Sequence, residues 1–163
     1  MNQTILLVED DANDVFFMKR AMKLAGMPNP VQVASDGLQA IHYLHGTGEY
    51  SDRARFPLPS LVLLDLKLPH VMGLDVLKWI RKQPDLRMII VLIFTSSKLP
   101  ADIQKAYFLG ANSYLVKPSE PEELAQRIKL IKRYWMEINQ LLPPLEYTGP
   151  PADTVKVFQS VLY

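Results

Sequence analysis

The chain has 163 residues, 48% of them hydrophobic, which is enough to bury the core of one domain. Its 18 Lys and Arg residues nearly balance its 17 Asp and Glu residues, which argues against a surface for nucleic acid or an anionic membrane. It contains no cysteine, which excludes disulfides, thiolate catalysis and zinc–thiolate sites. The sequence has no signal peptide and no apolar run of about 20 residues, so we expect a cytoplasmic protein.

The first half of the chain alternates short apolar runs with amphipathic stretches. Residues 4–8 form an apolar run, and residues 11–26 then carry apolar side chains at helical spacing up to a glycine. Residues 31–34 predict a second strand, and residues 36–44 predict a second helix. After a polar connection, residues 61–64 form a third apolar run.

The same alternation continues in the second half. Residues 73–82 predict a third helix, residues 89–94 a fourth strand and residues 101–110 a fourth helix. Residues 113–116 predict a fifth strand, and residues 120–142 predict one long final helix. Strands that are apolar at every position suit a parallel sheet covered on both faces. We therefore predict a flavodoxin-like, three-layer α/β sandwich with five parallel strands in the order 2-1-3-4-5, although composition alone leaves other α/β orders open.

Two segments lie outside this pattern. Residues 46–59 form a polar connection that is longer than usual for a domain of this kind. Residues 143–163 form a proline-containing tail. We therefore divide the chain into one domain, residues 1–142, and a C-terminal tail, residues 143–163.

Acidic side chains follow two strands that the predicted order places side by side. Glu9 and Asp10 follow the first strand and Asp65 follows the third, at the point where strand order reverses and open α/β sheets bind ligands. Crowded carboxylates repel one another unless a divalent cation lies between them, and Mg²⁺ prefers such oxygen ligands. We predict Mg²⁺ bound by Glu9 (partly through water), Asp10, Asp65 and the backbone carbonyl of Lys67. Taken alone, Asp10, Asp11 or Asp36 could each instead cap a helix, whereas Asp65 directly follows an apolar run.

Complementary groups follow the other two strands. Thr95 follows the fourth strand and Lys117 the fifth, and a cis Lys117–Pro118 bond would aim the ammonium inward. Taken alone, such a threonine is usually a turn residue and such a lysine is usually solvated. Together with the acids they indicate acyl-phosphate formation. In this interpretation Asp65 attacks a phosphoryl group, and Thr95 and Lys117 bind the phosphoryl oxygens.

Four segments, in the right order and spacing, resemble the CheY-like receiver family of two-component signalling. They are residues 5–11 (ILLVEDD), 63–73 (LLDLKLPHVMG), 95–97 (TSS) and 114–118 (YLVKP). The resemblance covers roughly residues 4–140. It implies that a sensor histidine kinase phosphorylates Asp65 and that the phosphoryl group is slowly lost by self-catalysed hydrolysis. It also implies a switch in which Thr95 moves toward the phosphate and Tyr114 turns inward.

Some features resemble a particular subgroup. The long connection at residues 46–59 and Asn13-Asp14 are similar to those of stand-alone regulators paired with bacterial phytochromes, so the resemblance implies a phytochrome as a candidate kinase. The chain departs from many receivers in having Glu9 rather than Asp, Met88-Ile89 where a proline is common, and an apolar His70-Val71-Met72. None of these departures removes a group from the predicted site.

The predicted final helix has apolar residues at coiled-coil spacing. They are Leu124, Ile128, Ile131, Trp135, Ile138 and Leu142. We expect its first half to pack on the sheet, and Trp135 and Ile138 to project beyond it as an exposed stripe. We therefore predict a homodimer through this helix or the tail, with residues 155–158 as a candidate for pairing with a neighbouring sheet edge. Output is expected through contacts with proteins rather than with nucleic acid.

Other functions fit the sequence less well. A phosphatase of the haloacid dehalogenase type needs a second Asp two residues after its nucleophile, where this chain has Lys67. A dinucleotide- or flavin-binding protein needs a glycine-rich loop after the first strand, and residues 9–14 contain no glycine. A degenerate receiver that binds partners without phosphorylation is the remaining alternative, against which the complete set of site residues argues. We therefore predict a phosphoacceptor rather than an enzyme.

Overall fold

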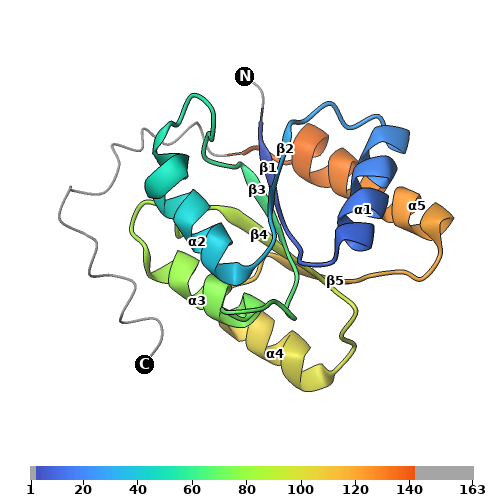
Figure 1. Cartoon of the computed structure of the whole chain (residues 1–163). Helices are drawn as coiled ribbons and strands as arrows, with labels where there is room; N and C mark the ends of the chain where they lie inside the picture. Colours follow the sequence, from blue (N-terminus) through green and yellow to red (C-terminus); the bar gives the residue numbers. More distant parts are fainter. Residues whose placement is uncertain (1–2, 142–163) are drawn as a thin grey trace.

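A computed structural model describes residues 3–141 as a three-layer α/β sandwich (Figure 1). Its sheet has five parallel strands in the order β2-β1-β3-β4-β5, which confirms the predicted topology. The strands are β1 (Ile5–Val8), β2 (Val31–Ala34), β3 (Leu61–Leu64), β4 (Ile90–Thr95) and β5 (Ser113–Val116). Among the described residues no helix is both long enough and apolar enough to cross a membrane.

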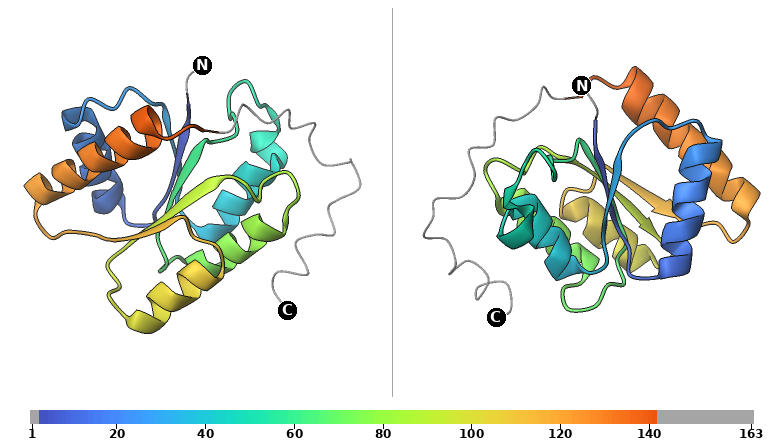
Figure 2. Two further views of the ribbon diagram at one scale, coloured as in Figure 1. Left: turned by 180° about the vertical axis from the view of Figure 1, so that it is seen from behind. Right: turned by 45° about the horizontal axis from the view of Figure 1, so that its top comes forward.

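Helices cover both faces of the sheet. They are α1 (Ala12–Leu24), α2 (Gly37–His45), α3 (Gly73–Lys82), α4 (Pro100–Phe108) and α5 (Pro121–Ile131). Figure 2 shows α1 and α5 on one face and the other three helices on the opposite face. Apolar strands with both faces covered are the arrangement that a parallel sheet requires.

Alternating side chains of the central strands supply two separate cores. Leu6 and Val8 of β1 pack with residues of α2, α3 and α4, whereas Ile5 and Leu7 pack with residues of α1 and α5. All residues of β1 and β3 are buried, as are all but the first of β4. The residues that directly follow these strands are therefore held at a rigid edge of the sheet.

Most predicted boundaries lie within two residues of the observed ones. Three strands have the predicted first and last residues, namely those at residues 31–34, 61–64 and 113–116. The helix predicted at residues 101–110 begins instead at Pro100, whose fixed φ suits the first helical position. The fourth strand is shifted by one residue, so that Thr95 is its last residue.

The predicted final helix is continuous from residue 121 to 138, but it is not α-helical throughout and it ends at Ile138. α5 ends at Ile131 and is followed by a π-helix, η2 (Lys132–Ile138). The wider π turn allows Trp135 and Met136, which are adjacent in sequence, both to pack against the α1–α5 core. Trp135 is therefore not part of an exposed stripe, although Ile138 is 54% exposed. The last position of the predicted seam, Leu142, and the segment 155–158 lie outside the described residues.

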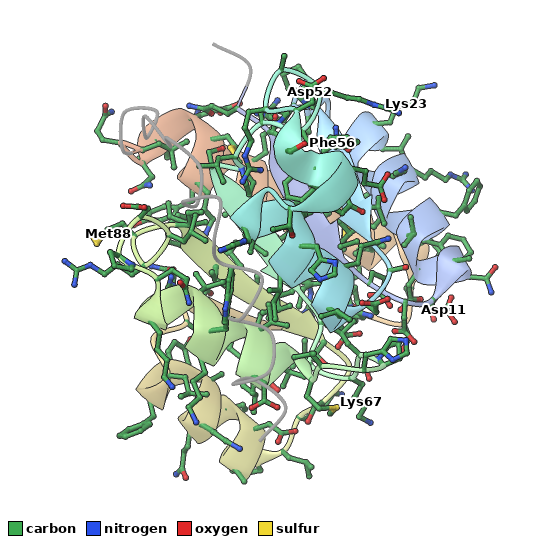
Figure 3. All side chains as sticks on the ribbon, turned by 60° about the vertical axis from the view of Figure 1, so that its left-hand side comes forward. Asp11, Lys23, Asp52, Phe56, Lys67 and Met88 are labelled. Atoms are coloured by element: carbon green, nitrogen blue, oxygen red, sulfur yellow. The ribbon has the colours of Figure 1, made fainter. Side chains whose placement is uncertain are left out.

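The long connection after α2 is ordered by aromatic packing. It contains a short 3₁₀ helix, η1 (Gly48–Ser51), whose buried Tyr50 packs against Tyr43 and Phe56. The Arg53 guanidinium donates to the carbonyl of Tyr43 at 2.8 Å and to that of Phe56 at 3.2 Å. In Figure 3, Phe56 and Asp52 lie at one end of the molecule, and Asp11 and Lys67, which follow β1 and β3, lie toward the other.

Candidate functional site

Three carboxylates meet at the carboxyl edge of the sheet. Val8 pairs with Leu64 in the β1–β3 ladder, so Glu9 and Asp65 leave adjacent strands side by side. The amide of Asp65 donates to the carbonyl of Val8 at 3.1 Å, which extends the ladder by one residue. One carboxylate oxygen from each of Glu9, Asp10 and Asp65 lies within 4.8 Å of the others. Glu9 and Asp65 are buried, whereas Asp10 is exposed.

The turn after β1 is fixed by a helix cap. The carboxylate of Asp11 accepts hydrogen bonds from the amides of Asn13 at 2.8 Å and Asp14 at 3.0 Å. These bonds satisfy two of the free amides at the start of α1. Asp11 therefore caps the helix, whereas Glu9 and Asp10 are the two acids of this turn that lie close to Asp65. A similar cap by Asp36 begins α2.

The loop after β3 holds the carboxylate of Asp65 in place. Oδ1 of Asp65 accepts from the amide of Leu66 at 2.6 Å and from that of Lys67 at 3.3 Å. Gly73 lets this loop return tightly, because a Cβ there would lie 1.9 Å from the carbonyl oxygen of Asp65. The backbone of Lys67 thus lies beside the carboxylate, and a metal bond to its carbonyl stays a prediction.

The ammonium of Lys117 bonds to three carboxylates. Nζ lies 2.5 Å from Oε2 of Glu9, 2.7 Å from Oδ2 of Asp65 and 2.8 Å from Oδ2 of Asp14. Burial alone would lower the pKa of Lys117, but the hydrogen bonds to Asp14, Asp65 and Glu9 raise it above its ordinary value. For Glu9, burial raises the pKa and outweighs the opposing effect of the Lys117 ammonium.

Lys117 faces inward with a trans bond to Pro118. All peptide bonds among the described residues are trans, so the conditional cis Lys117–Pro118 bond is not what directs this side chain. The chain reaches the site because β5 lies next to β4, with the amide of Lys117 donating to the carbonyl of Thr95 at 2.8 Å. A cavity of about 380 Å³ opens beside Lys117, between Phe17 of α1 and Pro121 of α5.

Thr95 and Tyr114 lie on the β4–β5 side of the site. Thr95 is fully buried, and among residues 3–141 no hydrogen bond joins it to Asp65. The hydroxyl of Tyr114 donates to the carbonyl of Ser97 at 3.1 Å, so this ring already reaches the loop after β4. Burial raises the pKa of Tyr114. The hydroxyl of Ser97 donates in turn to Asp102 of α4 at 2.5 Å, which ties the loop to the first turn of that helix.

Sequence reasoning missed two of these contacts. Asp14 was noted only as part of a subgroup pattern, although it lies in the first turn of a helix that starts at the acidic edge. That position was the available signal that its carboxylate could reach Lys117. The Ser97–Asp102 bond had no comparable signal, because both residues read as ordinary loop and helix-start residues.

Residues 5–129 match the family model of the response regulator receiver domain. The chain belongs to this family. Its relatives include the response regulator Rcp1 of Synechocystis, which is 35% identical over 135 residues that cover 83% of this chain and 90% of Rcp1. Another is the probable methanogenesis regulatory protein FilR2 of Methanothrix harundinacea, 38% identical over 83% of this chain and 85% of that protein.

Solved structures of this family have the same fold. The phosphorylated cyanobacterial phytochrome response regulator RcpA has a TM-score of 0.82 and 33% identity, covering 88% of this chain and 100% of RcpA. The Mn²⁺-bound form of Rcp1 has a TM-score of 0.79 and 34% identity, covering 86% of this chain and 99% of Rcp1. The chain is thus a receiver domain like Rcp1, in a family whose members are typically phosphorylated on Asp, and the phosphatase and flavin interpretations are not supported.

Proposed function

We propose that Asp65 is the phosphoacceptor of this receiver and that a sensor histidine kinase is the donor. One observation carries the proposal: the Asp65 carboxylate lies 2.7 Å from the Lys117 ammonium, with Glu9 and Asp10 beside it. A cation on one side and a group of metal-binding acids on the other are what a carboxylate needs to react with a phosphoryl group. The similarity to RcpA makes a phytochrome the candidate kinase.

The chemistry follows from the positions of these groups. An oxygen of Asp65 attacks phosphorus, and the bond from phosphorus to the donor imidazole nitrogen breaks, with the electron pair staying on nitrogen. The ammonium of Lys117 and the hydroxyl of Thr95 would hold the phosphoryl oxygens. In the later hydrolysis, water attacks phosphorus and releases a proton to solvent, inorganic phosphate forms, and Asp65 leaves as a carboxylate. We propose that the protein assists these two steps and is not an enzyme acting on a separate substrate.

The acidic group suits a hard divalent cation. Carboxylate oxygens of Glu9, Asp10 and Asp65 lie within 4.8 Å of one another, and such oxygens, with a backbone carbonyl and water, are typical Mg²⁺ ligands. We propose that these three residues and the carbonyl of Lys67 bind Mg²⁺. When bound, Mg²⁺ would neutralise negative charge on the phosphoryl oxygens. The Mn²⁺-bound form of Rcp1 supports a divalent cation in this family.

Intact mass after incubation with acetyl phosphate and Mg²⁺ tests the proposal. The protein should gain the mass of one phosphoryl group, and the Asp65→Asn variant should gain none. Asp85→Asn is the matched control, because Asp85 is exposed in the turn before β4, away from the site. A receiver that gains no phosphoryl group would favour the degenerate alternative. A gain that survives Asp65→Asn would place the phosphoacceptor elsewhere.

We also propose that the receiver forms a homodimer through the outer face of α5 and η2. Leu130, Tyr134 and Ile138 recur every four residues there and are 69%, 53% and 54% exposed. An apolar stripe of this kind is typical of a protein contact. Light scattering should give the mass of a dimer, and Ile138→Lys should give that of a monomer. Met88→Lys, at a residue that is 58% exposed in the turn before β4, should leave the dimer intact.

A further inference from the structure

Asp14 differs from the other two carboxylates that bond to Lys117. Its side chain is 46% exposed, whereas the side chains of Glu9 and Asp65 are 4% and 8% exposed. Among residues 3–141, the acids placed to share a metal ion are Glu9, Asp10 and Asp65, and Asp14 is not in that group. Asp14 thus contacts the ammonium of Lys117 but is not placed to bind a metal ion with the other acids.

The geometry sets up a competition for the same oxygens. An ammonium has three N–H donors, and in this structure each points to a different carboxylate. A divalent cation bound to Glu9 and Asp65 would compete with Lys117 for both of those carboxylates. The bond from Lys117 to Asp14 is the one that such a cation leaves untouched.

Local structure fixes Asp14 where it can keep this bond. The Asp11 cap holds the amide of Asp14 at 3.0 Å and starts α1 two residues before it. The free amides at the start of a helix also stabilise a negative charge in its first turn. Asp14 is therefore held in position by the backbone of α1.

We propose that Asp14 is a positioning residue that acts through Lys117. It holds the ammonium when Glu9 and Asp65 pass to a divalent cation, which favours cation binding at the site. This inference rests on the proposed function, because it takes Glu9 and Asp65 as metal ligands. Without the charge of Asp14, Lys117 stays on those two carboxylates and the cation competes less well.

Titration with Mn²⁺ alone, with free Mn²⁺ measured by electron paramagnetic resonance, tests this inference. Asp14→Asn should weaken Mn²⁺ binding by about five-fold, a size typical of coupling between contacting charges. Asp14→Glu keeps the charge and should restore binding. Asp75→Asn is the matched control, because Asp75 is an exposed acid in the first turn of α3 that makes no ion pair with Lys117. It should bind Mn²⁺ as the wild type does.

A double-variant cycle with Lys117→Met separates action through Lys117 from a direct effect of charge. Lys117→Met should bind Mn²⁺ more tightly than the wild type, and adding Asp14→Asn should then change the affinity by less than about two-fold. An equal loss in both backgrounds, or an equal loss in Asp14→Asn and Asp75→Asn, would overturn the inference. Circular dichroism of each variant checks folding.

The experiment uses no phosphodonor, so it is independent of whether Asp65 accepts a phosphoryl group. A wild type that binds no Mn²⁺ would overturn the metal site and this inference together. A wild type that binds Mn²⁺ with unchanged affinity in Asp14→Asn would overturn this inference alone.

Discussion

Two positively charged side chains, Lys117 and Arg81, lie at opposite edges of the sheet and bond to different kinds of acceptor. At the carboxyl edge, Lys117 bonds to the carboxylates of Glu9, Asp14 and Asp65. At the amino edge, Arg81 of α3 donates to the carbonyls of Gly110, Arg87 and Ile89 and to the side-chain oxygen of Asn112, at 2.9 to 3.0 Å. No carboxylate among the described residues pairs with Arg81.

The difference separates a structural cation from a reactive one. Arg81 satisfies backbone carbonyls between α3, β4 and β5, and burial lowers its pKa because no negative charge compensates it. Lys117 lies among more negative charge than it can neutralise, and its pKa is raised. The remaining negative charge at the carboxyl edge suits a divalent metal ion, which would neutralise the charge of an incoming phosphoryl group.

The largest expected effect is that of Lys117→Met on phosphorylation. The rate with acetyl phosphate should fall by about 100-fold or more, as when a donor to a developing charge is removed. Without Mg²⁺ the variant should also lose stability, because Glu9 and Asp65 then repel each other while buried. Mg²⁺ should restore part of this loss, which denaturant unfolding with and without chelator would measure.

Arg81→Met should reverse this pattern. We expect a loss of about 2–4 kcal/mol in unfolding free energy, because four acceptors lose a charged donor. Mg²⁺ should not restore the loss, and the phosphorylation rate of the folded protein should stay within about two-fold of the wild type. A strong fall in that rate would show that the two edges are coupled.

The pH dependence of stability gives the smallest effect. Burial lowers the pKa of His45, at the end of α2, below its ordinary value of 6.5. The unfolded chain therefore takes up a proton at His45 first as the pH falls below 6.5, so the free energy of unfolding should fall over that range and should not depend on His45 above it. His45→Phe should have a shallower pH slope between about pH 7 and pH 5 in denaturant titrations. An unchanged slope would assign the pH dependence to other groups.

The sequence predicted the carboxyl edge well because strand order determines it. Once continuous apolar runs are read as parallel strands in this order, Glu9 and Asp65 must leave adjacent strands, and Lys117 must leave its strand at the same edge of the sheet. Lys117 faces inward with a trans bond to Pro118, so a cis bond, which would also have aimed it inward, is not needed. The side chain of Lys117 is held by ion pairs with three carboxylates, one of which, Asp14, belongs to helix α1.

Features that depend on tertiary packing were not predicted. A heptad-like spacing at Ile131, Trp135 and Ile138 fits an ordinary α-helix and carries no sign of the π-helix, from which Trp135 packs against the α1–α5 core. The order in the connection at residues 46–59 comes from Tyr50 packing against Tyr43 of α2. Such contacts join residues whose spacing in the sequence carries no periodic signal.

Chemical mapping of the phosphoryl group tests the central claim most directly. Borohydride reduces an acyl phosphate to an alcohol and leaves a free carboxylate unchanged, so the phosphorylated aspartate becomes homoserine. After treatment with acetyl phosphate, Mg²⁺ and borohydride, peptide mass spectrometry should find homoserine at position 65 and unmodified acids at 9, 10 and 14. Reduction at one of those three acids, or none at Asp65 in a protein that has gained a phosphoryl group, would contradict the account.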